Sequence, residues 1–146
     1  MTENLNYLDS TIMVKRWRGL IFSAVAGDVG EKAEHYSNLM VKYLKDAEAF
    51  LAKGDYIQAS EKLWGAAAEV VKVVAAKRGV ELRTHGDLWE FVTKLRTELK
   101  DPDLSRLFLQ LNYLHQNFYE GILPPEAVMD GAEAVKEFID KLERLI

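Results

Sequence analysis

The chain has 146 residues and no cysteine, which excludes disulfide bridges and thiolate metal sites. Its 19 basic and 23 acidic side chains give a net charge of −4, which gives no general attraction to nucleic acid or to an anionic membrane surface. No apolar run approaches the length of a membrane span, and the acidic Glu3 precedes any apolar segment, so neither a span nor a secretory signal is expected. Length and composition favour a globular protein, and the absence of cysteine agrees with a cytoplasmic location.

Residues 1–31 are expected to form an N-terminal helical extension. Asp9 or Ser10 can cap a helix, and Gly27 and Gly30 are expected to bracket the turn that follows it. The apolar residues of this helix repeat at helical spacing: Met13, Trp17, Leu20 and Ala24. A small basic cluster is interpreted as a solvated face rather than a phosphate-binding patch: Lys15, Arg16 and Arg18.

Residues 32–52 are predicted to form the next helix, whose apolar face is expected to consist of Tyr36, Met40, Tyr43, Ala47 and Phe50. Gly54 ends this helix, because glycine tolerates the left-handed conformation at a helix C-terminus. Asp55 then caps the central helix, with Gln58 completing a capping box. The short loop requires the two helices to be antiparallel.

The helix that follows Asp55 and closes at Gly79 is predicted to be the centre of the fold. One apolar stripe consists of Tyr56, Ala59, Leu63, Ala66, Val70 and Val73, and a second consists of Ser60, Trp64, Ala67, Val71 and Ala75. Only a narrow strip is polar: Gln58, Glu61, Lys62, Glu69 and Lys72. A helix that is apolar over most of its circumference must be covered on several sides.

Three more helices are predicted towards the C-terminus. Thr84 caps the first, with Asp87 in its first turn. The second starts at Asp101-Pro102, with the proline at the first helical position, and ends at Gly121. Pro124-Pro125 starts the third. The expected core faces are Leu88, Val92, Leu95 and Leu99 for the first of these helices, and Val128, Val135, Phe138, Leu142 and Leu145 for the last. The sequence therefore predicts an all-α fold, an antiparallel up-and-down bundle of four to five helices over residues 32–146.

The helix after Pro102 carries one stripe of residues that could contact a ligand. Phe108, Asn112, His115 and Tyr119 follow one another at spacings of four, three and four residues. Because the adjacent leucine stripe must face the core, His115 is expected at the edge of the core. A histidine there can contact a base or transfer a proton, or it can simply fix helix packing or a dimer seam, and packing is the preferred interpretation.

Other candidate ligand contacts are His85, Trp64 and Lys72. His85 follows the cap Thr84, where exposed N–H groups can bind phosphate, although ordinary capping is preferred. Trp64 can stack on a base and Lys72 can neutralise a phosphate, but Trp64 is more simply a core residue. His35 is expected to be solvated. No histidines lie at metal-ligand spacing and no phosphate-binding glycine loop is present, so neither a metal nor another cofactor is expected.

Two family resemblances are visible in the central part of the chain. The string Gly54-Asp55-Tyr56-Ile57-Gln58-Ala59 looks like a tetratricopeptide turn, but no second copy follows at the repeat length. A longer ordered set resembles the HEPN superfamily, and its archaeal PaREP-like branch in particular. This set consists of Tyr43-Leu44-Lys45-Asp46-Ala47-Glu48, Gly54-Asp55-Tyr56, Ala59-Ser60-Glu61-Lys62, Trp64-Gly65-Ala66-Ala67-Ala68, Lys77-Arg78-Gly79, His85-Gly86-Asp87-Leu88 and Leu114-His115-Gln116-Asn117-Phe118-Tyr119-Glu120.

The resemblance implies a helical bundle, usually dimeric, that associates with nucleotides, nucleic acid or a partner nucleotidyltransferase. Ribonucleases of the HEPN superfamily resemble one another in an arginine four to six residues before a histidine. Here the matching histidine is His115, Gln110 lies five residues before it, and the nearest arginine is Arg106. We therefore expect a non-enzymatic module that binds a nucleotide-type ligand or a macromolecular partner as a homodimer. The alternatives are a metal-independent HEPN-type ribonuclease and a purely structural assembly subunit.

Overall fold

The computed structural model describes residues 27–146, which form five α-helices and no strand. The helices are α2 (Gly27–Lys53), α3 (Tyr56–Lys77), α4 (His85–Leu99), α5 (Asp103–Glu120) and α6 (Pro125–Glu143). The prediction of an all-α helical bundle is confirmed. The helix predicted within residues 1–26 and its basic cluster lie outside the described residues.

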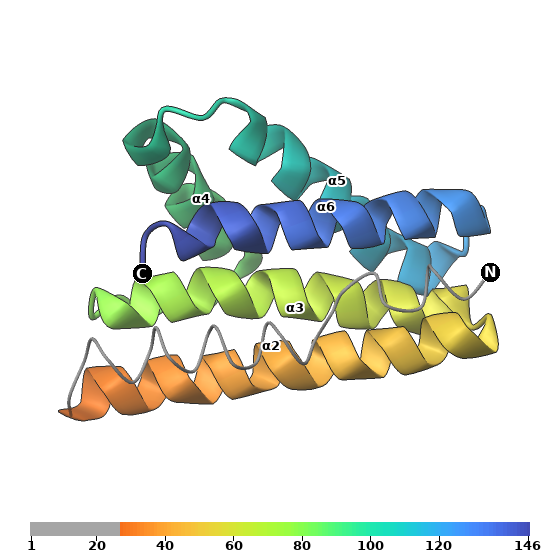
Figure 1. Cartoon of the computed structure of the whole chain (residues 1–146). Coiled ribbons are helices and arrows are strands. Elements are labelled where there is room, and N and C mark those ends of the chain that lie inside the picture. The colour runs from red at the N-terminus through yellow and green to blue at the C-terminus, as the bar shows by residue number, and fades with distance from the viewer. Residues whose placement is uncertain (1–26) are drawn as a thin grey trace.

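Helix α3 is the centre of the bundle, as the sequence predicts. It packs against each of the other four described helices, and Figure 1 shows it between α2 and α6. Both predicted apolar stripes are buried apart from the half-buried Tyr56 at the start of the helix. The predicted polar strip is also largely covered, because none of its five side chains is fully exposed and Glu69 is buried.

The direction of the chain alternates from helix to helix except between α3 and α4. His85 at the start of α4 lies beside Trp64, and Arg78 at the end of α3 pairs with Glu98 near the end of α4. These contacts show that α4 runs in roughly the same direction as α3. The connection from Arg78 to His85 must therefore run back along α3, and seven extended residues reach roughly 20 Å, about the length of α3 from Trp64 to Arg78.

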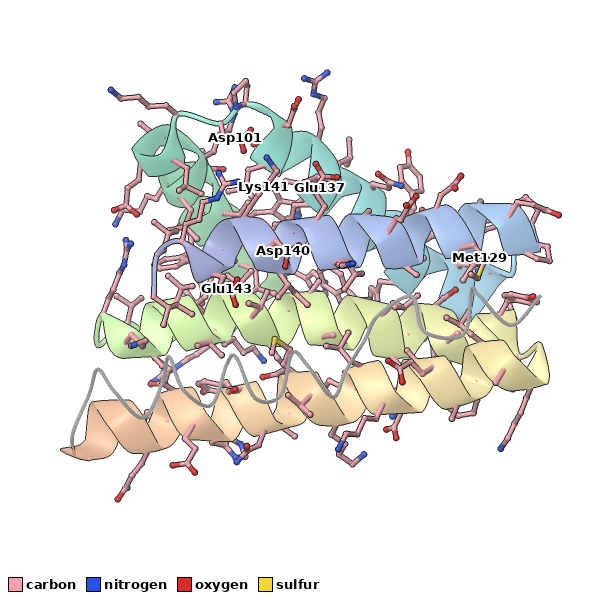
Figure 2. All side chains as sticks on the ribbon, in the orientation of Figure 1. Asp101, Met129, Glu137, Asp140, Lys141 and Glu143 are labelled. Carbon is pink, nitrogen blue, oxygen red and sulfur yellow. The ribbon has the colours of Figure 1, made fainter. Side chains whose placement is uncertain are left out.

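The C-terminal helix α6 packs against α3 and α5 and also contacts the turn between α4 and α5. In Figure 1 it lies alongside α3 and runs in the same direction. Its Lys141 forms an ion pair with Asp101 in the turn between α4 and α5, and Figure 2 shows the two side chains together there. Gly131 of α6 is buried against Leu114 of α5, where a Cβ atom would lie 2.6 Å from a leucine methyl group. Any larger residue at this position would force the Leu114 side chain to shift.

Three local predictions need correction. Gly27 and Gly30 lie inside α2, not in a turn, because glycine is tolerated near a helix start, where the first N–H groups have no intrahelical partner. Pro102 is the N-cap of α5 rather than its first residue. The Asp55 carboxylate caps α3 by accepting from the Gln58 N–H, but the Asp55 N–H donates to the Phe50 carbonyl group instead of completing a capping box.

The buried face of α2 is rotated from the predicted one. Its buried residues are Ala33, Ser37, Met40, Leu44, Ala47 and Leu51, whereas Tyr36, Tyr43 and Phe50 are only half-buried. The reason is the close approach of α2 to α3 at Gly65, where a Cβ atom would lie 3.0 Å from the Tyr43 ring. Aliphatic side chains such as Met40 and Leu44 fill the seam, and the aromatic rings lie along its border.

None of the helices formed by residues 27–146 has the length and apolarity that a membrane crossing requires.

Candidate functional site

A carboxylate and an imidazole from two different helices form the polar centre of the candidate site. Glu61 of α3 and His115 of α5 are both partly buried, and the Oε1 atom of Glu61 lies 2.9 Å from the Nδ1 atom of His115. An ionised carboxylate can only accept hydrogen bonds, so Nδ1 carries the hydrogen and donates it. This contact fixes the ring orientation and leaves Nε2 as the nitrogen that can accept a proton or a ligand hydrogen.

Rings from three helices surround this pair. The His85 ring of α4 stacks on Trp64 of α3 at a centroid distance of 5.3 Å and an interplanar angle of 3°. The His115 ring centroid lies 5.3 Å from that of His85 and 5.4 Å from that of Trp64, with interplanar angles of 33° and 35°. Trp64 is only 5% exposed, so its faces are covered and it acts as the support for both imidazoles. His85 itself is exposed.

Tyr119 forms the outer border of the cluster. It lies one helical turn after His115, with its ring edge-on to the imidazole at a centroid distance of 5.3 Å. The side chain is 72% exposed, which is high for an aromatic residue. Asn112, predicted on the same stripe, donates its amide hydrogen to the Phe108 carbonyl group of its own helix at 2.7 Å. That bond satisfies the amide locally and leaves its carbonyl oxygen for another contact.

The N-terminus of α4 is closed by its own acidic side chain. Thr84 accepts from the Asp87 N–H, and the Asp87 carboxylate accepts from the N–H groups of Thr84 and Arg83. These backbone hydrogen bonds hold the pKa of Asp87 below its usual value. Because the Asp87 carboxylate already places a negative charge at this end of the helix, the geometry favours capping over phosphate binding at the start of α4.

Lys72 does not belong to the cluster around His115. Its ammonium group lies 3.5 Å from the Glu69 carboxylate and 5.8 Å from the centre of the Tyr36 ring. It therefore lies on the α2 side of α3. Of the six predicted contacts, the structure brings together His85, His115, Trp64 and Tyr119, with Asn112 one turn before His115.

Sequence reasoning missed two polar residues near the site. The sequence pattern assigns Glu61 only to the polar strip, although its position three residues before Trp64 puts both on neighbouring parts of one helix face. Asn117 is fully buried, donates to the Ser60 hydroxyl at 2.9 Å and accepts from the Leu123 N–H at 2.7 Å. This network fixes the end of α5, and hence His115, against α3.

Across residues 27–146, no three histidine, aspartate or glutamate side chains are grouped in a way that could hold a metal ion.

Known proteins similar to this chain agree with the fold. A crystal structure of a protein from Sulfolobus solfataricus superposes with a TM-score of 0.64 at 24% sequence identity, over 73% of this chain and 95% of that one. At this identity the similarity shows the fold alone. No curated protein matches the chain. The sequence model of the archaeal PaREP1/PaREP8 family matches residues 35–139. This match spans all of α3, α4 and α5 and most of α2 and α6, and the chain therefore belongs to the archaeal PaREP1/PaREP8 family.

Proposed function

We propose that this protein is a non-enzymatic binding module for a small ligand of nucleotide type. The proposed site consists of Glu61, His85, His115 and Tyr119, with Trp64 beneath them. The observation that carries the proposal is the meeting of these residues from three helices, with the His115 ring oriented by Glu61 at 2.9 Å and the His85 ring supported by Trp64.

The chemistry of this cluster suits a planar heterocycle. His85 and Tyr119 are exposed rings on which a nucleobase can stack, an interaction that contributes about 1–3 kcal/mol per base in nucleic-acid-binding proteins. His115 can accept a base N–H through Nε2, and the second oxygen of Glu61 can accept another. The exocyclic amino and ring N–H groups of nucleobases are matching donors.

The negative charge near the site indicates that the base of a nucleotide, rather than its phosphate, provides most of the binding affinity. The Asp87 carboxylate, which accepts from the N–H groups of Arg83 and Thr84 just before α4, and the Glu61 carboxylate both place negative charge near the site. The net charge of −4 adds no general attraction for a phosphate. We therefore expect a nucleoside to bind about as tightly as its monophosphate.

A thermal-shift screen with nucleosides and their monophosphates tests the proposal. A ligand that binds only the folded state at 100 times its dissociation constant adds about 2.7 kcal/mol to the free energy of unfolding. For a domain of this size the melting temperature should rise by roughly 6–10 °C. His85→Ala should abolish most of this rise, while His35→Ala should retain it, because His35 is an exposed histidine of α2 outside the cluster.

Equal shifts in the parent and both variants would contradict the proposed site. No shift with any nucleoside or monophosphate would contradict the ligand class.

Membership of the HEPN superfamily remains part of this proposal, and so does the ribonuclease alternative. The Glu61–His115 contact favours that alternative, because a carboxylate that orients an imidazole also suits it for proton transfer. The absence of an arginine four to six residues before His115 argues against the ribonuclease alternative. Gln110 is exposed and uncharged, and Arg106 pairs with Asp103 at the other end of α5.

We expect no RNA cleavage when the purified protein is incubated with single-stranded RNA and a chelator. Cleavage by the parent that disappears in His115→Ala would promote the ribonuclease alternative and overturn the non-enzymatic proposal.

We further propose that the protein is a homodimer, and that a macromolecule such as a nucleotidyltransferase is its alternative partner. The support is the set of exposed large apolar side chains along α5 and just after it: Leu109, Tyr113 and Ile122. Aromatic anchors of this kind are enriched at interfaces. Light scattering at micromolar concentration should give twice the chain mass of 16.6 kDa.

A further inference from the structure

The Glu61 carboxylate has hydrogen-bonding capacity that the described part of the chain does not use. Its Oε1 atom accepts from His115 Nδ1, and no second hydrogen-bond partner of this carboxylate is present among residues 27–146. An ionised carboxylate has about four acceptor positions on its two oxygens. The Glu61 side chain is 26% exposed, so a ligand can reach it. The structure therefore leaves a carboxylate edge, oriented by His115, that can accept two parallel N–H groups.

Among the common nucleobases, guanine alone presents two N–H groups side by side on its pairing edge. The ring N1–H and the 2-amino group of guanine match the two oxygens of a carboxylate, as the fork of an arginine does. Adenine and cytosine each place an unprotonated ring nitrogen beside the amino group, and the ring N–H of uracil or thymine lies between two carbonyl groups. Against a carboxylate, each of these bases replaces one hydrogen bond with a repulsion between lone pairs.

The rings beside Glu61 suit the remainder of a guanine. His85 and Tyr119 are exposed, and Trp64 stacks beneath His85 at a centroid distance of 5.3 Å, so a purine can stack on a supported ring. Neither the Tyr119 hydroxyl nor the His85 ring has a hydrogen-bond partner among residues 27–146, and each can donate one hydrogen. The O6 and N7 atoms of guanine are acceptors for such donors.

We propose that the ligand site selects guanine, and that Glu61 is the residue that determines this preference. The inference rests on the proposed nucleotide-binding function and names the base. Glu61 accepts from both N1–H and the 2-amino group, while the rings of His85 and Tyr119 provide stacking for any base. Other bases therefore still bind, but more weakly.

Titration calorimetry at neutral pH with three nucleoside 5′-monophosphates tests the proposal. The ligands share ribose and phosphate, so differences in affinity arise from the base. Inosine monophosphate differs from guanosine monophosphate only by lacking the 2-amino group, which removes one hydrogen bond to a charged acceptor. Guanosine monophosphate should bind on the order of tenfold more tightly than inosine monophosphate. Its advantage over adenosine monophosphate should be at least about as large.

Glu61→Gln isolates the role of the carboxylate. An amide offers one acceptor oxygen, and its NH₂ group opposes the 2-amino group of guanine. The preference for guanosine over inosine monophosphate should therefore fall to within about twofold. A merely structural role for Glu61 would weaken all three ligands alike and leave their ratios unchanged. Glu137→Gln is the matched control, because Glu137 is an exposed glutamate on α6 outside the cluster, and it should keep the parent preference. Circular dichroism checks that each variant is folded.

A guanidinium group also presents two parallel N–H groups to a carboxylate, and methylguanidine is the probe for it. Methylguanidine that binds as tightly as guanosine monophosphate would show that the site recognises this group alone, which would overturn the selection of guanine.

Two further outcomes would overturn the inference and leave the proposed binding function intact. One is equal affinity for the three monophosphates, and the other is a preference for guanosine monophosphate that survives Glu61→Gln. Failure of all three monophosphates to bind would contradict the proposed function itself and the inference with it, so the two failures can be told apart.

Discussion

Two glutamates on α3, about two turns apart, have opposite surroundings. Glu61 lies at the edge of the bundle and accepts a hydrogen bond from His115. Glu69 is 7% exposed, its Oε1 atom is 3.5 Å from Lys72, and its Oε2 atom is buried without a hydrogen-bond partner among the described residues. Burial raises the pKa of the Glu69 carboxyl group.

The difference shows how the position of a carboxylate on α3 affects the free energy of folding. A carboxylate in the seam with α2 loses hydration and regains little of it through one long contact with a lysine. A carboxylate at the edge keeps part of its hydration and orients a neighbouring ring. The first arrangement opposes folding at neutral pH, and the second one leaves stability nearly unchanged while building a site.

The largest loss of stability is expected for Ala67→Arg, which buries a charge without an ion-pair partner in α3. Ala67 is fully buried in the second apolar stripe, so an arginine there is both overpacked and without a partner. We expect a loss of at least about 4 kcal/mol in the free energy of unfolding and a fall in melting temperature of more than roughly 8 °C. Calorimetry checks this, and a variant that melts within about 1 °C of the parent would show that Ala67 is not enclosed.

Removing a buried polar group whose hydrogen bonds are all satisfied should also destabilise the protein. Asn117→Ala deletes the donor to Ser60 and the acceptor of the Leu123 N–H, and it leaves a cavity. We expect a loss of about 2–3 kcal/mol in urea denaturation. Asn112→Ala is the matched control on the same helix, with an expected loss below about 1 kcal/mol, because the Asn112 amide bonds only a carbonyl group already inside a helix. Similar losses in both variants would argue against the buried network.

Glu69→Gln should stabilise the protein at pH 7 by about 1 kcal/mol, since the neutral amide avoids burying a charge. The folded-state pKa of Glu69 lies above its ordinary value of 4.5. The cost of burying the charged carboxylate is therefore absent at low pH, where Glu69 is protonated in both the folded and the unfolded state. This cost grows as the pH rises from 4.5 through the folded-state pKa. The stabilisation should therefore vanish near pH 3–4. Destabilisation at pH 7 would mean that the ion pair with Lys72 outweighs desolvation.

The smallest expected effect on stability belongs to Glu61→Gln. The amide oxygen can still accept from the His115 Nδ1–H, and both groups are partly exposed. The free energy of unfolding should change by less than about 0.5 kcal/mol in urea denaturation. Ligand-induced stabilisation should fall in the same variant, since one acceptor charge is lost. A large loss of stability would instead make this contact structural.

The helices were predictable because their signals are local. Asp55 and Thr84 as caps, the two stripes of α3 and the two prolines at the start of α6 each depend on residues a few positions apart. The buried face of α2 was not, because it depends on the packing of α3, where Gly65 lies against the Tyr43 ring.

The candidate site was predictable only as separate members. Glu61 and His115 are 54 residues apart in the sequence, and His85 joins them only because the connection after Arg78 runs back along α3. No local pattern specifies that return path, so the contact between Glu61 and His115 appeared only in the three-dimensional structure.

The most direct test of the ligand site uses the three histidines as internal reporters. Their side-chain NMR signals can be followed while adenosine, or another nucleoside chosen by the thermal-shift screen, is titrated into the protein. The signals of His85 and His115 should shift and saturate together, while that of His35 on α2 should stay in place. Saturable binding that leaves His85 and His115 unmoved, or that shifts His35 instead, would contradict the proposed site.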